Sequence, residues 1–170
     1  MAQIFRVVLF MYEDFVQIDR IDRKILAMLV ANGRATQHEL GEAAGLSPSA
    51  AARRQKALED AGILRGYRAD INLTRLGMGA TVMVTITLDS QSEEAMEAFE
   101  AAVSGSPSIL RCHLMSGRND YLLTVRATSI EDYEHVHRQE IARLPRVARI
   151  ETAFALREVV NRTVPPRLLG

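Results

Sequence analysis

The chain of 170 residues has little of several features that mark specialised classes of protein. It contains one cysteine, Cys112, so it cannot form an intrachain disulfide, and a reducing cytoplasm is the expected compartment. Its formal net charge is zero, with 21 basic and 21 acidic residues, and apolar residues make up 48% of it. These values exclude a disordered tail, a collagen-like chain and a histone-like polycation, and they allow one medium domain or two small ones.

Long hydrophobic runs are also missing. The run Val7–Met11, like every other apolar run in the chain, is far shorter than the roughly 20 residues that span a bilayer, so we expect no membrane partner. Arg6 before this run resembles the start of a signal peptide, but residues 12–14 follow with two acids and no small-residue cleavage site. Residues 1–17 do not match the pattern that begins at Ile18. They are an extra strand, a partner-binding arm or an upstream start, and the sequence leaves these alternatives open.

Helical periodicity begins after this N-terminal extension. Apolar residues recur at helical spacing over residues 19–31, and Gly33 suits a left-handed cap after that helix. Residues 36–39, Thr-Gln-His-Glu, form a capping box that starts a short helix over 37–43, which Gly45 ends. The residues of the short helix that are expected to face inward are Leu40, Ala43 and Ala44.

A third helix follows after a short turn. Ser47 is a good N-cap, Pro48 suits the first helical position, and the helix is expected to run to about Ala61. Two helices separated by such a turn predict a helix-turn-helix. The segment Ile63–Ile71 is expected to be extended, like a wing strand, and residues 72–79 are interpreted as a linker.

The second half of the chain changes character. Residues 80–88 are β-branched and alternate, which predicts a strand. Further strands are predicted over 108–115, 120–127 and 147–156, and helices over 92–104 and 130–143. The order βαββαβ is that of a ferredoxin-like domain, so the predicted fold class is α+β.

One face of the third helix is basic and small, while Ala51, Gln55 and Leu58 lie on its other side. Arg53 on the outward face has the geometry to bond a guanine edge with two hydrogen bonds, and Arg54 and Lys56 suit phosphates. A solvated face of an ordinary helical bundle is the alternative. The residues expected to contact DNA are Thr36, Ser47, Ser49, Ala50, Arg53, Arg54 and Lys56.

Local charge supports the DNA interpretation despite the zero total. Residues 53–68 carry five basic and two acidic residues, a local net charge of +3. Phosphate neutralisation depends on where charges lie, so the zero of the whole chain does not exclude DNA. An excess of +3 is modest, and we expect at least two copies on one duplex.

The chain resembles the Lrp/AsnC family of transcription regulators. The resemblance rests on IDRIDRKIL at 18–26, GRATQHELGEAAGLSPSA at 33–50, ALEDAGILRGY at 57–67, CHLMSGRNDYLL at 112–123 and REVV at 157–160. It implies a winged helix-turn-helix domain over 18–71, the linker 72–79, a ferredoxin-like domain over 80–163 and a tail at 164–170. It also implies double-stranded operator DNA as a partner, homodimers that assemble to octamers, and a small effector, usually an amino acid.

The resemblance places the effector at the predicted turn between the second and third strands. Asp120 offers an acceptor for an ammonium group, while Arg118 and backbone N–H groups around Gly117 offer donors for a carboxylate. A plain hairpin turn is the alternative. The chain departs from the family pattern at Gln55, where the family is usually apolar, and at three effector positions. The expected effector residues are Leu114, Ser116, Gly117, Arg118, Asn119, Asp120, Tyr121 and Ala153, with the departures at Arg118, Asn119 and Ala153.

Other chemistry has little support, and we expect no metal site, cofactor or catalytic residues. His135 and His137 point in different directions on a helix, and Cys112 and His113 alternate across a strand.

Two rival functions stay open. One is a ligand-binding module that no longer binds DNA. The other is an enzyme similar to the sirohaem decarboxylases, with His113, His135 or His137 acting on a propionate side chain.

Overall fold

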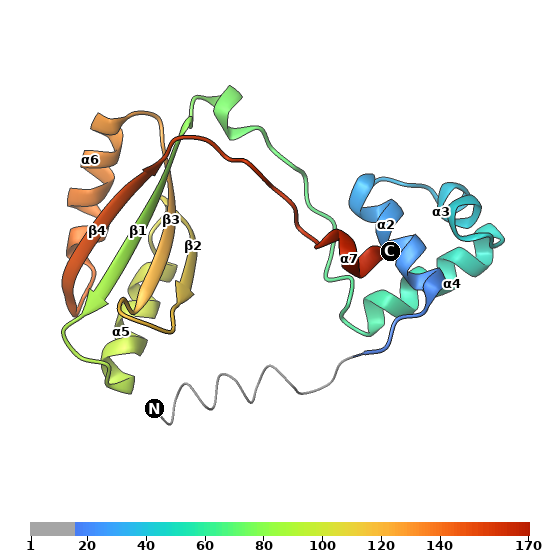
Figure 1. Cartoon of the computed structure of the whole chain (residues 1–170), viewed down its shortest axis with the longest axis horizontal. Coiled ribbons are helices and arrows are strands. Elements are labelled where there is room, and N and C mark those ends of the chain that lie inside the picture. The colour runs from blue at the N-terminus through green and yellow to red at the C-terminus, as the bar shows by residue number, and fades with distance from the viewer. Residues whose placement is uncertain (1–15) are drawn as a thin grey trace. The chain divides into compact units, whose positions relative to one another are not determined.

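The computed structural model describes residues 16–170, and these form two compact units (Figure 1). The first unit contains residues 16–70 together with Val160–Gly170, and the second unit contains Ile71–Val159. The three interpretations of the N-terminal extension concern residues that lie almost wholly outside this range. The C-terminal residues, expected to be a plain tail, therefore group with the N-terminal unit.

The helices of the first unit begin where local capping chemistry predicts. They are α2 (Arg20–Ala31), α3 (Gln37–Ala44) and α4 (Pro48–Asp60). Asp19 and Thr36 each form a capping box, and Ser47 accepts the N–H of Ala50 while Pro48 takes the first helical position. The predicted helix-turn-helix is confirmed. The side chains buried between these helices are Ile25, Leu26, Leu29, Leu40, Ala44, Ala51 and Leu58.

Two local predictions in this unit are wrong. Helix α2 ends at Asn32 in an extended conformation, and Gly33 is not among the glycines with positive φ, so it is not a left-handed cap. Ala43 is exposed, and the third buried residue of α3, beside Leu40 and Ala44, is Gly41. A Cβ on Gly41 would lie 2.7 Å from the carbonyl oxygen of Leu46, so α3 meets the following turn too closely for any side chain.

The segment after α4 also differs from expectation. Ile63–Ile71 forms no strand, because the sheet of the described chain consists of strands from the second unit alone. The linker is not entirely irregular, since Leu73–Leu76 forms a 3₁₀ turn. The C-terminal residues form a short helix, α7 (Pro166–Leu169).

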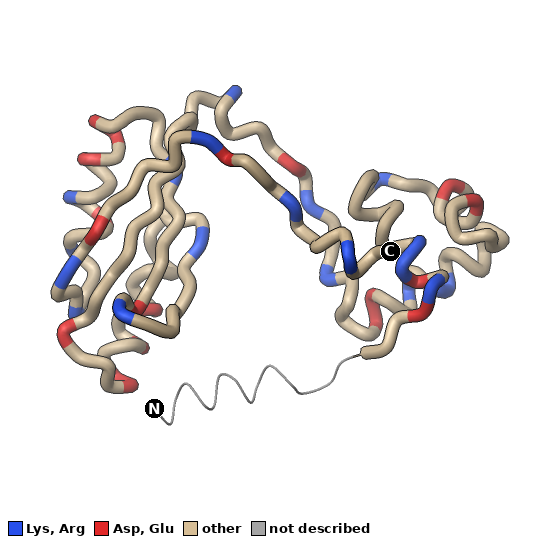
Figure 2. The backbone as a smooth tube through the Cα atoms, viewed as in Figure 1, with Lys and Arg blue, Asp and Glu red and all other residues tan. Residues whose placement is uncertain are grey.

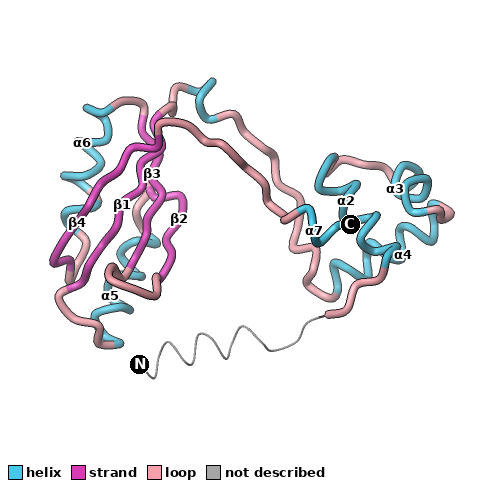
Figure 3. The backbone as a smooth tube through the Cα atoms, in the orientation of Figure 1, coloured by secondary structure: helices cyan, strands magenta, loops and turns pink. Residues whose placement is uncertain are grey.

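The second unit has the predicted βαββαβ order (Figure 3). Its elements are β1 (Ala80–Leu88), α5 (Glu93–Ser104), β2 (Ile109–Leu114), β3 (Tyr121–Ala127), α6 (Ile130–Gln139) and β4 (Val147–Ala155). The strands pair antiparallel in the order β2-β3-β1-β4. The last predicted helix is shorter than expected, because α6 ends at Gln139 and Ile141–Arg143 forms a 3₁₀ turn.

The sheet of the second unit is covered by α5 and α6 on one face. Alternate residues of β1, from Val82 to Leu88, are buried there against Phe99 of α5 and Tyr133 and Val136 of α6. The intervening residues of β1 are only half-buried and lie on the face without helices. The residues of β1 on that helix-free face are Thr81, Met83, Thr85 and Thr87.

Candidate functional site

Helix α4 presents an exposed polar face while its opposite side is buried. Ala51 is fully buried and Leu58 is 4% exposed, which fixes the orientation of the helix in its unit. Figure 2 shows the basic and acidic positions along the backbone. Of the predicted DNA contacts, Ala50 and Arg54 are half-buried, and Thr36, Ser47, Ser49, Arg53 and Lys56 are exposed.

The three basic residues of α4 have different surroundings. Lys56 Nζ lies 3.0 Å from Asp60 Oδ1, an exposed pair that raises the pKa of Lys56. Within residues 16–170 the ion pairs of α4 are those of Lys56 and Arg54, so Arg53 is exposed without a carboxylate partner. Arg53 is therefore the cation of α4 whose guanidinium is ready for an external ligand.

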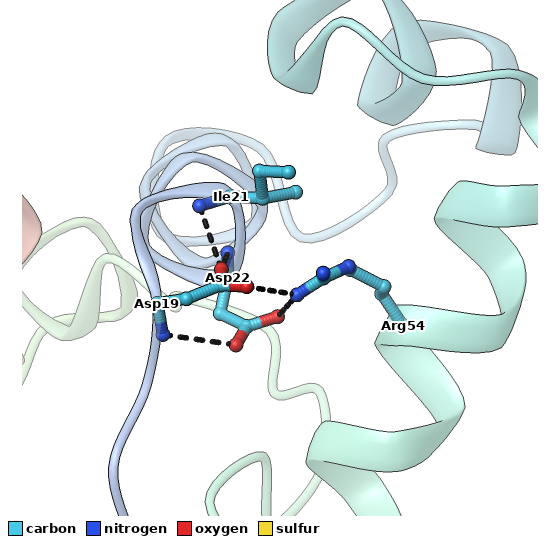
Figure 4. A network of polar contacts seen from close by, with 4 residues as sticks. All are labelled: Asp19, Ile21, Asp22 and Arg54. Atoms are coloured by element: carbon cyan, nitrogen blue, oxygen red, sulfur yellow. Dashed lines mark hydrogen bonds and ion pairs between the residues drawn. The ribbon is translucent and has the colours of Figure 1, made fainter.

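Arg54 ties α4 to the start of α2 (Figure 4). Its Nη1 lies 2.6 Å from Asp19 Oδ2 and 2.8 Å from Asp22 Oδ1. The same two carboxylates form the capping box of α2, in which Asp19 Oδ1 accepts the N–H groups of Ile21 and Asp22. Hydrogen bonds to Asp22 and then Asp19 raise the pKa of Arg54, and the backbone N–H of Asp22 is the main cause that lowers the pKa of Asp19. The sequence predicted a phosphate contact for Arg54 and did not reveal this pairing.

Gln55 is half-buried and joins three segments of the unit. Its Oε1 accepts a hydrogen bond from Gln37 Nε2 at 2.6 Å, and its Nε2 donates to the hydroxyl of Tyr67. That hydroxyl donates in turn to Glu59 Oε1 at 2.8 Å. The Gln55 side-chain amide thus has polar partners. The Tyr67 hydroxyl holds the segment after α4 against that helix, although the segment forms no strand. Sequence patterns did not indicate Gln37 or Tyr67.

The predicted effector loop is anchored by Asp120, which is only 7% exposed. Asp120 Oδ2 accepts the N–H of Leu88 at 2.8 Å, and Oδ1 accepts Gln91 Nε2 at 2.7 Å. Asn119 Oδ1 accepts the hydroxyl of Thr87 at 3.3 Å. The turn residues Ser116, Gly117 and Arg118 are exposed. The loop is therefore held by the end of β1 and by Gln91 in the connection to α5, partners that sequence patterns did not indicate.

The remaining predicted effector residues lie in different surroundings. The Tyr121 side chain is buried in the core, where its hydroxyl donates to Glu100 Oε1 at 2.7 Å, and burial raises its pKa. Ala153 is exposed on β4, paired with Met83, at the opposite edge of the sheet from β2. Leu114 is half-exposed and pairs with Tyr121. The structure thus brings residues 116–120 together but separates them from Ala153 and from the Tyr121 side chain.

Residues 16–170 lack both a metal-binding cluster and a membrane-spanning helix. That range holds no group of three or more His, Cys, Asp or Glu side chains placed to bind a metal ion. None of its helices combines the length and apolar character needed to span a bilayer. Burial raises the pKa of the Cys112 thiol to about 11, which makes it a poor nucleophile at neutral pH.

Two family models match the chain. A winged helix-turn-helix DNA-binding model matches residues 18–65, and the Lrp/AsnC ligand binding domain matches residues 81–165. The chain belongs to the Lrp/AsnC family. The leucine-responsive regulatory protein of Salmonella typhimurium is 38% identical to this Lrp/AsnC chain over 142 residues, covering 84% of it and 87% of the relative. The proline dehydrogenase transcriptional activator of Rhodobacter capsulatus is 36% identical over 148 residues, covering 87% and 96%.

Solved structures agree with this assignment. A transcriptional regulator from Neisseria meningitidis in complex with L-Met aligns with a TM-score of 0.83 at 34% identity, covering 88% of the Lrp/AsnC chain and 97% of the neighbour. The AsnC protein of Escherichia coli aligns with a TM-score of 0.80 at 26% identity, covering 88% and 99%. The predicted α+β fold class is confirmed. The chain is a transcriptional regulator with a DNA-binding helix-turn-helix and a ligand-binding domain.

Proposed function

We propose that this regulator binds a near-palindromic operator sequence-specifically through α4, and that an amino acid changes its assembly or its affinity for that operator. The observation that carries the proposal is the exposed face of α4, where Arg53, which has no ion-pair partner among residues 16–170, lies beside Ser49 on a helix fixed by Ala51 and Leu58. Such a face fits the major groove, because small residues allow close approach and an arginine reads a guanine edge.

The basic residues of α4 divide their roles in this proposal. Arg53 contacts a base, and Lys56, whose pair with Asp60 is exposed and weak, contacts a phosphate. Arg54 positions α4 on α2 through Asp19 and Asp22. This role for Arg54 replaces the phosphate contact that the sequence suggested.

We propose homodimers that assemble into octamers. The helix-free face of the sheet supports this, since it carries Met83 and Leu122 half-buried among threonines and Ala153 exposed beside them. A covering partner would bury Met83 and Leu122 further on this threonine-rich face. The local charge of +3 on residues 53–68 also favours two copies on one duplex, because phosphate contacts then add.

The loop from Ser116 to Asp120 is the proposed effector site. An effector carboxylate would accept from Arg118 and exposed backbone N–H groups, and an effector ammonium would compete with Gln91 for Asp120 Oδ1. The L-Met complex of the Neisseria meningitidis relative supports an amino acid as the ligand class. Asp120 then has two roles, because it also holds the N–H of Leu88.

Substitutions at Asp120 separate these two roles. Asp120→Ala should abolish any amino-acid response and lower the free energy of unfolding by about 1–3 kcal/mol, because the N–H of Leu88 loses its acceptor. Asp120→Asn keeps an oxygen for Leu88 but loses the charge, so it should abolish the response with a smaller loss of stability. Both variants should still bind DNA. Thermal shifts with each of the twenty amino acids measure these effects, and an unchanged response in Asp120→Asn would show that the loop assignment is wrong.

The DNA proposal is tested by titrating the regulator against the DNA immediately upstream of its own gene at several salt concentrations. A random duplex of equal length is the control. Specific binding should be tighter than binding to the control and should weaken steeply with salt, because several phosphates are neutralised per dimer. Equal affinity for the two duplexes would contradict the proposed function.

A further inference from the structure

The last residues of the chain are part of the N-terminal unit. Val160–Gly170 groups with residues 16–70, and α7 contacts α2 (Figure 1). Leu169 packs against the hydrophobic cluster that includes Ile25 and Leu29 of α2. Residues from both ends of the chain therefore build one core.

The packing of α7 is specific to one of two adjacent leucines. Leu169 is half-buried against the cluster, whereas the neighbouring Leu168 is 45% exposed and lies outside it. Helix α7 has four residues, too few for a helix to be stable alone. Its order therefore depends on the contact that Leu169 makes, after Pro165 and Pro166 have set the start of the helix.

Helix α2 in turn holds α4, the helix that is proposed to contact DNA. Asp19 and Asp22 at its start bind the guanidinium of Arg54, and Ile25 and Leu29 pack in the core that also contains Ala51 and Leu58 of α4. A group that fixes α2 thus also fixes α4.

We propose that the C-terminal segment is a second tether between the two units and that Leu169 is its anchor. Docking of Leu169 holds α2 in place and, through Arg54, sets the orientation of α4. The C-terminal segment follows directly from β4. A displacement of β4 is therefore transmitted to the first unit, which contains α4, through residues 156–165 as well as through the linker 72–79. The effect on α4 rests on the proposed function, whereas the docking itself does not.

Hydrogen exchange on the full-length regulator tests the docking. Leu169→Asp places a charge in the apolar contact, so the amides of α2 from Ile25 to Leu29 should exchange about tenfold faster than in wild type. Leu168→Asp, one residue away and exposed, is the matched control and should leave them unchanged. Amides of β1 and β3 should be unaffected in both variants. Equal protection of α2 in the two variants would overturn the proposal.

Leu169→Ala covers the case in which the aspartate unfolds the unit. It removes most of the apolar contact without a charge, and it should raise α2 exchange by a smaller factor in the same amides. Operator affinity supplies the second readout, since Leu169→Asp should bind the operator more weakly than Leu168→Asp. Equal operator affinities despite faster α2 exchange would overturn the link to α4. A wild type that binds no DNA would refute the proposed function, while the exchange result would still decide the docking.

Discussion

Replacing Gly41 with alanine should destabilise the DNA-reading unit and abolish operator binding. The added Cβ would lie 2.7 Å from the Leu46 carbonyl oxygen and 3.4 Å from the Pro48 nitrogen, and both are backbone atoms that cannot rotate away. The clash falls where Leu46 donates its N–H to the Gly41 carbonyl at 2.8 Å, just before α4 begins. Overpacking of this kind costs about 1–3 kcal/mol, and relief of the clash would displace the start of α4.

Gly33→Ala is the matched control for Gly41→Ala. Its Cβ would meet nothing nearer than the Leu29 carbonyl oxygen at 3.8 Å, an ordinary van der Waals contact. The free energy of unfolding of the Gly33→Ala variant should stay within about 0.5 kcal/mol of the wild-type value, as for most surface substitutions. Chemical denaturation followed by circular dichroism measures both variants. Equal stability of the two would show that the turn before α4 adapts without cost.

Arg53→Ala should relax the operator sequence requirement at a single base pair. A bidentate arginine–guanine contact provides about 1–3 kcal/mol of discrimination, and Arg53 is the basic residue of α4 that is exposed without an ion-pair partner in residues 16–170. The measurement compares wild type and variant on an operator and on a set of operators with single base-pair changes. A variant that keeps the full preference at every position would exclude Arg53 from base recognition.

Arg54→Ala provides the contrasting case from the next position along the helix. Loss of the ion pairs with Asp19 and Asp22 should lower the melting temperature and weaken all DNA sequences alike. The salt dependence of the remaining affinity separates positioning from contact, because each lost phosphate contact lowers the slope by about 1. The slope of log affinity against log salt concentration should be unchanged if Arg54 only positions α4. A reduced slope would show that Arg54 contacts a phosphate.

Much of the fold was predictable because its signals are local. The capping box at Thr36, the Ser47-Pro48 start of α4 and the alternation along β1 each lie within a few residues. The absence of a wing strand was not predictable, because an extended pattern over Ile63–Ile71 does not show whether a partner strand is present. In the structure that segment is held by the Tyr67 hydroxyl on α4.

The parts of the site that sequence patterns missed depend on contacts between distant residues. Sequence patterns indicate Asp120 as a ligand-binding acid but not its contact with Leu88, which lies 32 residues earlier. Sequence patterns predict a phosphate contact for Arg54 and miss its partners Asp22 and Asp19, because these lie 32 and 35 residues away. Gly41 resembled any helical glycine, because its closeness to Leu46 exists only after the turn has formed. Local patterns locate the elements of such a site but not the side chains that fasten them together.

The packing of Leu169 also bears on the order in which the chain matures during synthesis. Leu169 follows every element of the second unit in the chain, whereas the core that it joins is built mainly from residues 18–64. The ribosome makes the DNA-reading helices before the second unit, but their core lacks the Leu169 side chain until that unit has also been synthesised. The core of the DNA-reading unit, begun before the second unit, is therefore completed after it.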